Sequence, residues 1–186
     1  MTTAAWAILI VAIAAIAFGS LMAWKVRRTQ TLRSRFGPEY DRLVQERGSA
    51  SLAEKELEHR EKRVEKFKIR PLTHEECDRF TLEWRAAQER FVDDPRGAVA
   101  EADALVQQAM KARGYPTGGD FDMRVADLSV DHPDVVQNYR TGHAIALRDA
   151  REPVSTEDLR TAMKHYRALF EELVERRVSE FAEVRK

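Results

Sequence analysis

The sequence predicts an all-α protein with a single N-terminal transmembrane helix, a charged helical stalk and a C-terminal bundle of about five helices. Three observations lead to this fold class. An uncharged run of 21 residues lies at Ala4–Trp24; all six prolines fall at or between expected helix starts; and no stretch shows the sustained apolar alternation of a strand. These observations divide the chain into a short extracytoplasmic amino-terminus (1–3), the membrane helix (4–24), a juxtamembrane segment and stalk (25–70) and the bundle (71–186).

The composition narrows the function classes. The 186 residues include 31 Lys+Arg and 31 Asp+Glu, so the formal net charge is zero. A neutral chain is not typical of a dedicated nucleic-acid-binding protein. The single cysteine, Cys77, excludes an internal disulfide and a multi-cysteine metal site, and it is consistent with a reducing compartment.

The uncharged run has the length of a bilayer core. At about 1.5 Å per residue it spans roughly 31 Å, and Trp6 and Trp24 lie near its ends, where indole rings favour the membrane interface. A cleaved signal peptide is the alternative, but no positive charge precedes the run. Ala15, Gly19 and Ala23 recur every fourth residue and form a candidate packing face for a second transmembrane helix.

The flanking charges predict the orientation. No cation precedes the run, whereas five follow it before the first acid: Lys25, Arg27, Arg28, Arg33 and Arg35. By the positive-inside rule the C-terminal domain is cytoplasmic and the N-terminus is outside. We call these five residues the basic collar; each can add about 1 kcal/mol of attraction to anionic lipids.

Two helices are expected in the stalk. Pro38 opens a short one that ends near Gly48, and a Ser51–Glu54 capping box opens a second, from about residue 52 to 69. The second helix is densely charged, with a narrow apolar seam (Ala53, Leu57, Val64 and Phe67) interrupted at Arg60 and Glu61. It is either a solvated spacer or a short coiled coil that joins two copies.

The bundle helices have broader apolar faces. We expect them at about 74–92, 95–113, 121–129, 131–149 and 156–181, with capping boxes at Thr73–Glu76 and Ser155–Asp158 and with Asp131 capping the fourth. Burying one large side chain contributes about 1.5–3 kcal/mol, against a few tenths for a surface charge pair. Apolar faces, rather than ion pairs, should therefore hold the bundle together.

Several runs of the sequence resemble an uncharacterised family of bacterial membrane-anchored or "secreted" proteins with an amino-terminal apolar segment. The runs are Phe36–Val44 (FGPEYDRLV), Glu83–Val106, Arg113–Pro116 (RGYP), Ala126–Arg140 (ADLSVDHPDVVQNYR) and Ser155–Leu173. The resemblance covers most of the chain from Phe36 to Leu173. The resemblance implies a bacterial source, so the expected membrane is the bacterial inner membrane. It implies no activity, cofactor or site residue.

The residues that could support chemistry are few. The sequence has no phosphate loop with its lysine, no Gly-x-Ser-x-Gly and no His-Glu-x-x-His, so we expect no catalysis and no cofactor. The best candidate is a polar pocket formed by Tyr139, Arg140 and His143 with His165 of the last helix. The alternative is that His143 is a structural histidine with one hydrogen-bond partner.

Two weaker candidates have simpler explanations. His74 and Cys77 are three residues apart and could share a metal, but Cys77 begins an apolar stripe, so no metal is expected. Asp127, Asp131 and Asp134 could bind a cation or act as acid and base. Capping of helix starts is the simpler role.

These observations together predict a binding or scaffold protein on the cytoplasmic face of the inner membrane. Its partners would be anionic lipids and another protein or a second copy, and not nucleic acid. A small-ligand or metal sensor that uses the Tyr139/His143/His165 pocket is one alternative. An exported periplasmic helical protein is the other.

Overall fold

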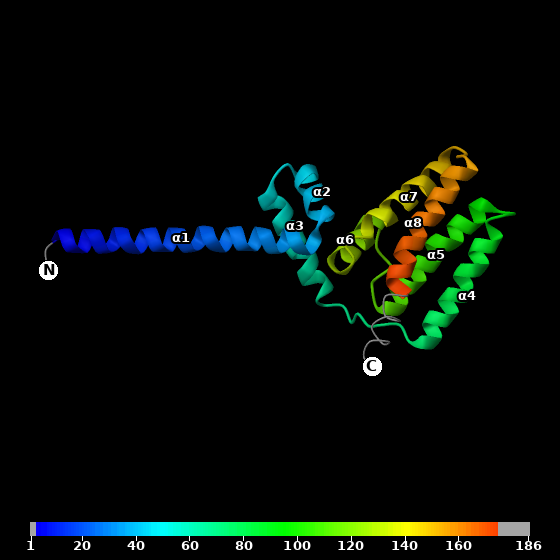
Figure 1. Ribbon diagram of the computed structural model, residues 1–186, viewed down its shortest axis with the longest axis horizontal. Coiled ribbons are helices and arrows are strands. Elements are labelled where there is room, and N and C mark those ends of the chain that lie inside the picture. Colours follow the sequence, from blue (N-terminus) through cyan, green and yellow to red (C-terminus); the bar gives the residue numbers. More distant parts are fainter. Residues whose placement is uncertain (1–2, 175–186) are drawn as a thin grey trace. The chain divides into compact units, whose positions relative to one another are not determined.

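A computed structural model describes residues 3–174, without the side chains of residues 3–12 and 14. Over the described residues the chain forms eight helices and no strand, which confirms the all-α class (Figure 1). The chain divides into two compact units, residues 1–57 and 58–186.

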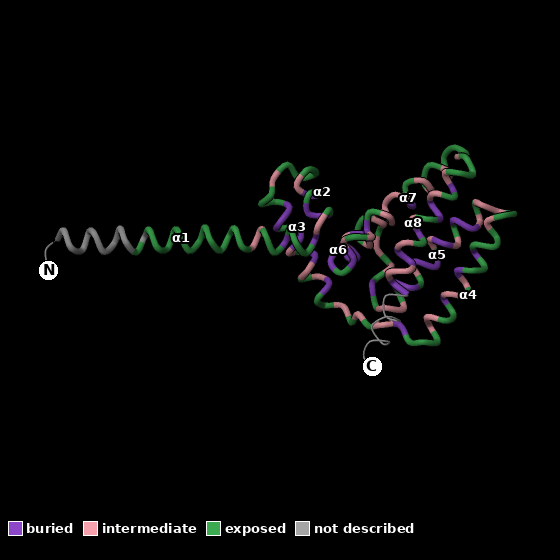
Figure 2. Tube along the Cα trace, viewed as in Figure 1, coloured by how far each residue is buried: buried purple, intermediate pink, exposed green. Residues whose placement is uncertain are grey.

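The first unit begins with α1 (Thr3–Phe36), one continuous helix that contains both the uncharged run and the basic collar. Within the described residues, the structure contains no helix with the length and apolar character needed to cross a membrane. The side chain of Trp6 and residues 1–2 lie outside the described part. Trp24 and the small residues Ala15, Gly19 and Ala23 are exposed on α1 (Figure 2).

Two further helices complete this unit: α2 (Pro38–Arg47) and the first half of α3 (Ala50–Val64). α2 ends at Gly48, whose φ of 67° is the left-handed conformation expected at such a helix end. A small core joins the three helices and comprises Leu32, Phe36, Tyr40, Leu43, Ala53 and Leu57. The seam of α3 is therefore already buried within the chain, which leaves little of it for a coiled coil with a second copy.

The predicted Ser51–Glu54 capping box is wrong. α3 begins at Ala50, and the Glu54 carboxylate instead accepts hydrogen bonds from the Thr29 hydroxyl at 2.7 Å and the Tyr40 hydroxyl at 3.2 Å. These contacts lie within the first unit and link α3 to α1 and α2. A long-range partner has displaced the local one.

The second unit contains the bundle of five helices: α4 (His74–Arg90), α5 (Pro95–Arg113), α6 (Phe121–Asp131), α7 (Val136–Arg151) and α8 (Thr156–Val174). The capping box of α4 is present, and Ser155 and Asp158 exchange the expected hydrogen bonds at the start of α8. α4 and α7 both pack beside α5 and α8, and the buried positions follow the facing sides of these helices (Figures 1 and 2). The part of the last helix predicted beyond Val174 lies outside the described residues.

Two helix boundaries differ from the prediction for tertiary reasons. α3 stops at Val64 instead of residue 69, and the chain then runs beside the end of α5, where the Arg70 amide donates to the Arg113 carbonyl at 2.8 Å. α7 starts at Val136, and Asp131 is the last residue of α6 rather than a cap. The Asp131 carboxylate accepts a hydrogen bond from the Tyr115 hydroxyl at 2.6 Å.

The second unit starts at Glu58, inside the segment predicted as stalk. Arg60, expected to interrupt the seam, is buried and donates to the Ser129 hydroxyl at 3.1 Å. Arg63 donates from Nε to Asp127 at 2.7 Å. The carboxyl half of α3 therefore packs on α6 and is not a solvated spacer.

Candidate functional site

The four residues of the predicted polar pocket lie in two different environments. Tyr139 is fully buried, and its ring and that of His143 both contact Phe121; the His143 and Phe121 rings stack at 3.7 Å between centroids. His165 instead has Nδ1 2.9 Å from the Asn138 side-chain oxygen, and Arg140 is half-buried. The structure thus brings Tyr139 and His143 together around Phe121, while His165 has a separate partner.

A different set of polar residues surrounds Tyr139. Asp103 of α5, Arg124 of α6, Tyr139 of α7 and Tyr166 of α8 lie close together: the Tyr139 hydroxyl interacts with Arg124 and the Tyr166 hydroxyl with Asp103, but each of the four residues keeps a buried side-chain atom without a well-formed hydrogen bond among the described residues. The two tyrosine rings meet edge to face at 6.2 Å. We call these four residues the internal polar cluster. Because an unsatisfied buried polar atom is costly, such a cluster is where a water or a small polar molecule would bind.

The electrostatics of the cluster favour binding over nucleophilic chemistry. Burial raises the pKa of Tyr139 to about 12 and also raises the pKa of Tyr166, with the charge of Asp103 acting in the same direction. Both phenols therefore stay protonated near neutral pH and can donate or accept a hydrogen bond. Burial lowers the pKa of His143, so its imidazole stays neutral.

His132 follows Asp131 in a polar stretch of the sequence, yet the structure buries it. Its side chain is 5% exposed at the end of α6, and Nδ1 lies 2.9 Å from the Glu172 carboxylate on α8. Burial lowers the pKa of His132. The contact with Glu172 joins the end of α6 to α8. The other ring nitrogen of His132, Nε2, is buried and has no hydrogen-bond partner among the described residues.

The weaker candidates have structural partners. Cys77 donates its thiol to the Val174 carbonyl at 3.4 Å, and burial raises its pKa, so it is not a reactive thiolate. Asp127 is buried against Arg63, whereas Asp134 is exposed. Within residues 3–174, the described side chains form no group of three or more His, Cys, Asp or Glu that could hold a metal ion.

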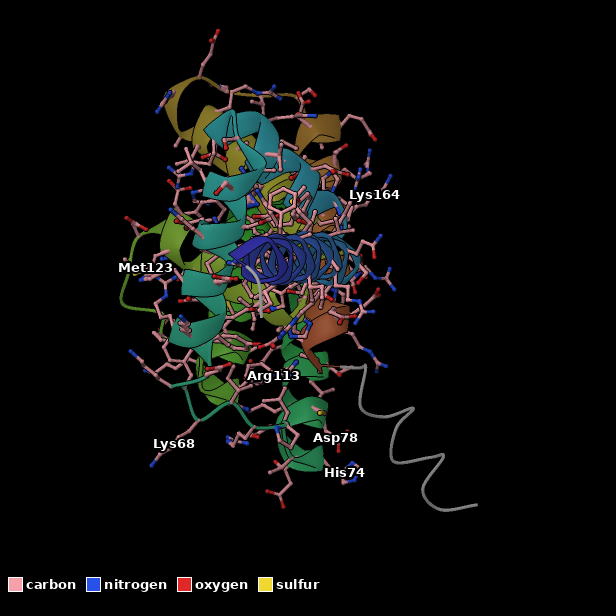
Figure 3. All side chains as sticks on the ribbon, turned by 90° about the vertical axis from the view of Figure 1, so that its left-hand side faces the viewer. Lys68, His74, Asp78, Arg113, Met123 and Lys164 are labelled. Carbon is pink, nitrogen blue, oxygen red and sulfur yellow. The ribbon has the colours of Figure 1, made fainter. Side chains whose placement is uncertain are left out.

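A groove between α4 and α8 is a second candidate site, which was not predicted from the sequence. Its volume is about 250 Å³, and it is lined by Gln88, Phe91, Arg160, Met163, Lys164 and Arg167. We call it the α4–α8 groove. Lys164 extends outwards from α8 (Figure 3). The sequence does contain a sign of this groove: Arg160, Lys164 and Arg167 are three or four residues apart, a spacing that places three cations on one face of a helix.

Comparison with protein-family models, with curated proteins and with solved structures gave no match. No family is therefore identified, and the resemblance noted in the sequence stays a prediction.

Proposed function

We propose that this chain is a single-pass, membrane-anchored helical binding or scaffold protein at the cytoplasmic face of a bacterial inner membrane. The observation that supports the proposal most is the order of residues along α1. The uncharged run Ala4–Trp24 is followed by five cations, with no acid until Glu39. No described helix, α1 included, has the length and apolar character needed to cross a membrane, so the proposal rests on the sequence, in which an uncharged run followed by five cations suits a bilayer core next to an anionic lipid surface.

The polar contacts of the bundle support binding rather than catalysis. Many of its charged side chains cap helices or join neighbouring helices, as Glu76 does at the start of α4 and Asp127 does between α6 and α3. The tyrosines of the internal polar cluster are protonated, and the cationic groove faces outwards. A partner protein is the class of ligand that suits an anchored bundle of this kind.

Protease digestion of spheroplasts tests the anchor and its orientation. A carboxyl-terminal epitope should be protected in intact spheroplasts and digested after lysis, and the protein should stay in the membrane fraction after alkaline carbonate extraction. Digestion in intact spheroplasts would support an exported periplasmic protein and overturn the proposed topology.

Variants of the basic collar provide a control. Replacing Lys25, Arg27 and Arg28 with glutamine removes three of the five cations of the collar, and we expect part of the population to invert. Replacing the exposed cations Lys55, Lys62 and Lys66 in the same way should leave the orientation unchanged.

The internal polar cluster favours a second candidate, a small-ligand sensor. A ligand that satisfies the Asp103 carboxylate and the two phenols would raise the unfolding temperature of the full-length chain in a screen of small polar molecules. That shift should disappear in Tyr139→Phe and Tyr166→Phe and persist in His165→Asn. A shift that persists in both tyrosine variants would place the ligand elsewhere. Self-association through Ala15, Gly19 and Ala23 stays a prediction.

A further inference from the structure

The α4–α8 groove combines an apolar floor with a cationic wall. Phe91 and Met163 provide apolar surface, and α8 contributes Arg160, Lys164 and Arg167. None of the described lining residues is acidic. Such a lining is unexpected in this chain, because the residues that follow the basic collar have more acids than bases.

The contacts that Arg160 and Arg167 make within the chain are exposed and weak, and one of them is the Arg160 guanidinium over the Phe91 ring at 5.8 Å from its centroid. Arg160 and Arg167 pair with Glu157 and Glu171 on their own helix, and every member of these pairs is at least 40% exposed. Exposed pairs of this kind contribute only a few tenths of a kcal/mol. An incoming carboxylate can therefore replace Glu157 or Glu171 with little loss, and the exposed Lys164 lies between the two arginines.

The geometry points to an acidic, amphipathic segment of a partner protein as the occupant of this groove. The seven helical steps from residue 160 to residue 167 rise about 10 Å, the same distance that three carboxylates at helical spacing would span on a partner. A volume of about 250 Å³ accommodates one or two side chains; it is below the roughly 300 Å³ at which small-molecule sites begin. One apolar side chain would lie on Phe91 and Met163 while carboxylates pair with the cations around it.

A flat anionic membrane fits the groove less well. A bilayer would also approach the surface around the groove, and the body of the protein is mildly acidic. This inference rests on the proposed binding role and adds the chemistry of the partner.

Peptide binding to the full-length chain in detergent micelles tests the inference. The probe is a fluorescent helical peptide with three glutamates at the spacing of 160, 164 and 167 and one leucine between them; a second peptide has glutamine at the same three positions. Fluorescence anisotropy should show binding of the glutamate peptide that weakens with added salt and is at least about tenfold tighter than for the glutamine peptide. Replacing the leucine with serine should weaken binding about fivefold.

Charge reversal identifies the surface. Lys164→Glu should weaken binding of the glutamate peptide at least about tenfold, whereas Lys111→Glu, at an exposed lysine of α5, should change it less than about twofold. Equal binding of the two peptides, no binding, or an unchanged affinity in Lys164→Glu would overturn the inference. So would equally effective competition by glycerol phosphate, which indicates a headgroup site, or a dimer that Lys164→Glu dissociates, which indicates a second copy.

Failure of this test and failure of the proposed function give different results. If the peptide does not bind while the carboxyl-terminal epitope stays protected in spheroplasts, only the assignment of the groove is wrong. If the epitope is digested, the topology is wrong whatever the peptide does.

Discussion

Replacing Arg63 with alanine should destabilise the protein more than replacing its partner Asp127 with asparagine. The Asp127 side chain is 3% exposed; its carboxylate accepts a hydrogen bond from Arg63 Nε at 2.7 Å, and Arg63 Nη2 lies 2.5 Å from the same oxygen as an ion pair. Removing one partner of a fully buried pair costs about 3–5 kcal/mol, because the remaining charge is left unpaired.

The expected cost for Arg63→Ala is somewhat smaller. The Arg63 side chain is 27% exposed, so water will partly solvate the carboxylate that remains; we expect a loss of about 2–3 kcal/mol in the free energy of unfolding. Asp127→Asn keeps an oxygen that accepts from Arg63 and removes the buried charge, so its cost should stay within about 1 kcal/mol.

The pH dependence has a definite sign. Burial raises the pKa of Asp127 by more than Arg63 lowers it, so the folded protein binds this proton more readily than the unfolded chain. The stability contributed by the Asp127 carboxyl is therefore complete below its unfolded pKa and is lost as the pH rises through the folded pKa. The cost of Arg63→Ala should accordingly shrink as the pH falls and Asp127 becomes protonated.

Urea unfolding of the full-length chain in mild detergent, followed by far-UV circular dichroism, measures these differences. Arg85→Ala, at an exposed arginine of α4, is the control and should change the free energy of unfolding by less than about 0.5 kcal/mol. The reasoning is refuted if Asp127→Asn costs as much as Arg63→Ala, or if the cost of Arg63→Ala is the same at acidic and neutral pH.

Three further predictions can be checked by the same unfolding measurement. Gly114→Ala should cost at least about 2 kcal/mol, because φ is 97° and the new Cβ would lie 2.4 Å from the Lys68 carbonyl oxygen; Gly118→Ala, with no atom within 4 Å, should change stability little. Since burial lowers the pKa of His132, stability should fall as the pH drops below the unfolded pKa of histidine, and His132→Gln should flatten that slope. Thr73→Ala should cost about 1 kcal/mol through the lost cap of α4.

The sequence predicted those helix ends that depend on neighbouring residues. The Thr73 and Glu76 side chains bond each other's backbone amides, and Asp94 accepts from the Gly97 amide at 2.9 Å. Gly114 ends α5 in the left-handed conformation. In each of these cases the partners lie within a few residues and the pattern of residue types finds them, whereas the equally local Ser51–Glu54 pattern fails because Thr29 and Tyr40 bond the Glu54 carboxylate.

The predictions that failed concern side chains whose partners are distant in the sequence. Asp131 has the sequence context of a cap, but its carboxylate is bonded by Tyr115, 16 residues away. His132 follows it in a polar stretch, yet Glu172, 40 residues away, is its partner. No local pattern shows which helix end will lie beside α8, so the burial of His132 becomes visible only in the packed bundle.

The internal polar cluster and the α4–α8 groove were missed for the same reason, and their separation gives a last test. Asp103 follows Ala102 on a helix whose buried positions are apolar, and its neighbours Arg124 and Tyr166 come from two other helices. Lys164 lies close to Tyr166 in sequence, but Tyr166 is fully buried and Lys164 is exposed. Tyr166→Phe should therefore leave the affinity for the acidic peptide unchanged, and Lys164→Glu should leave any small-ligand shift unchanged. If either variant altered both measurements, the two sites would be coupled through α8, and the binding and sensing roles would no longer be alternatives.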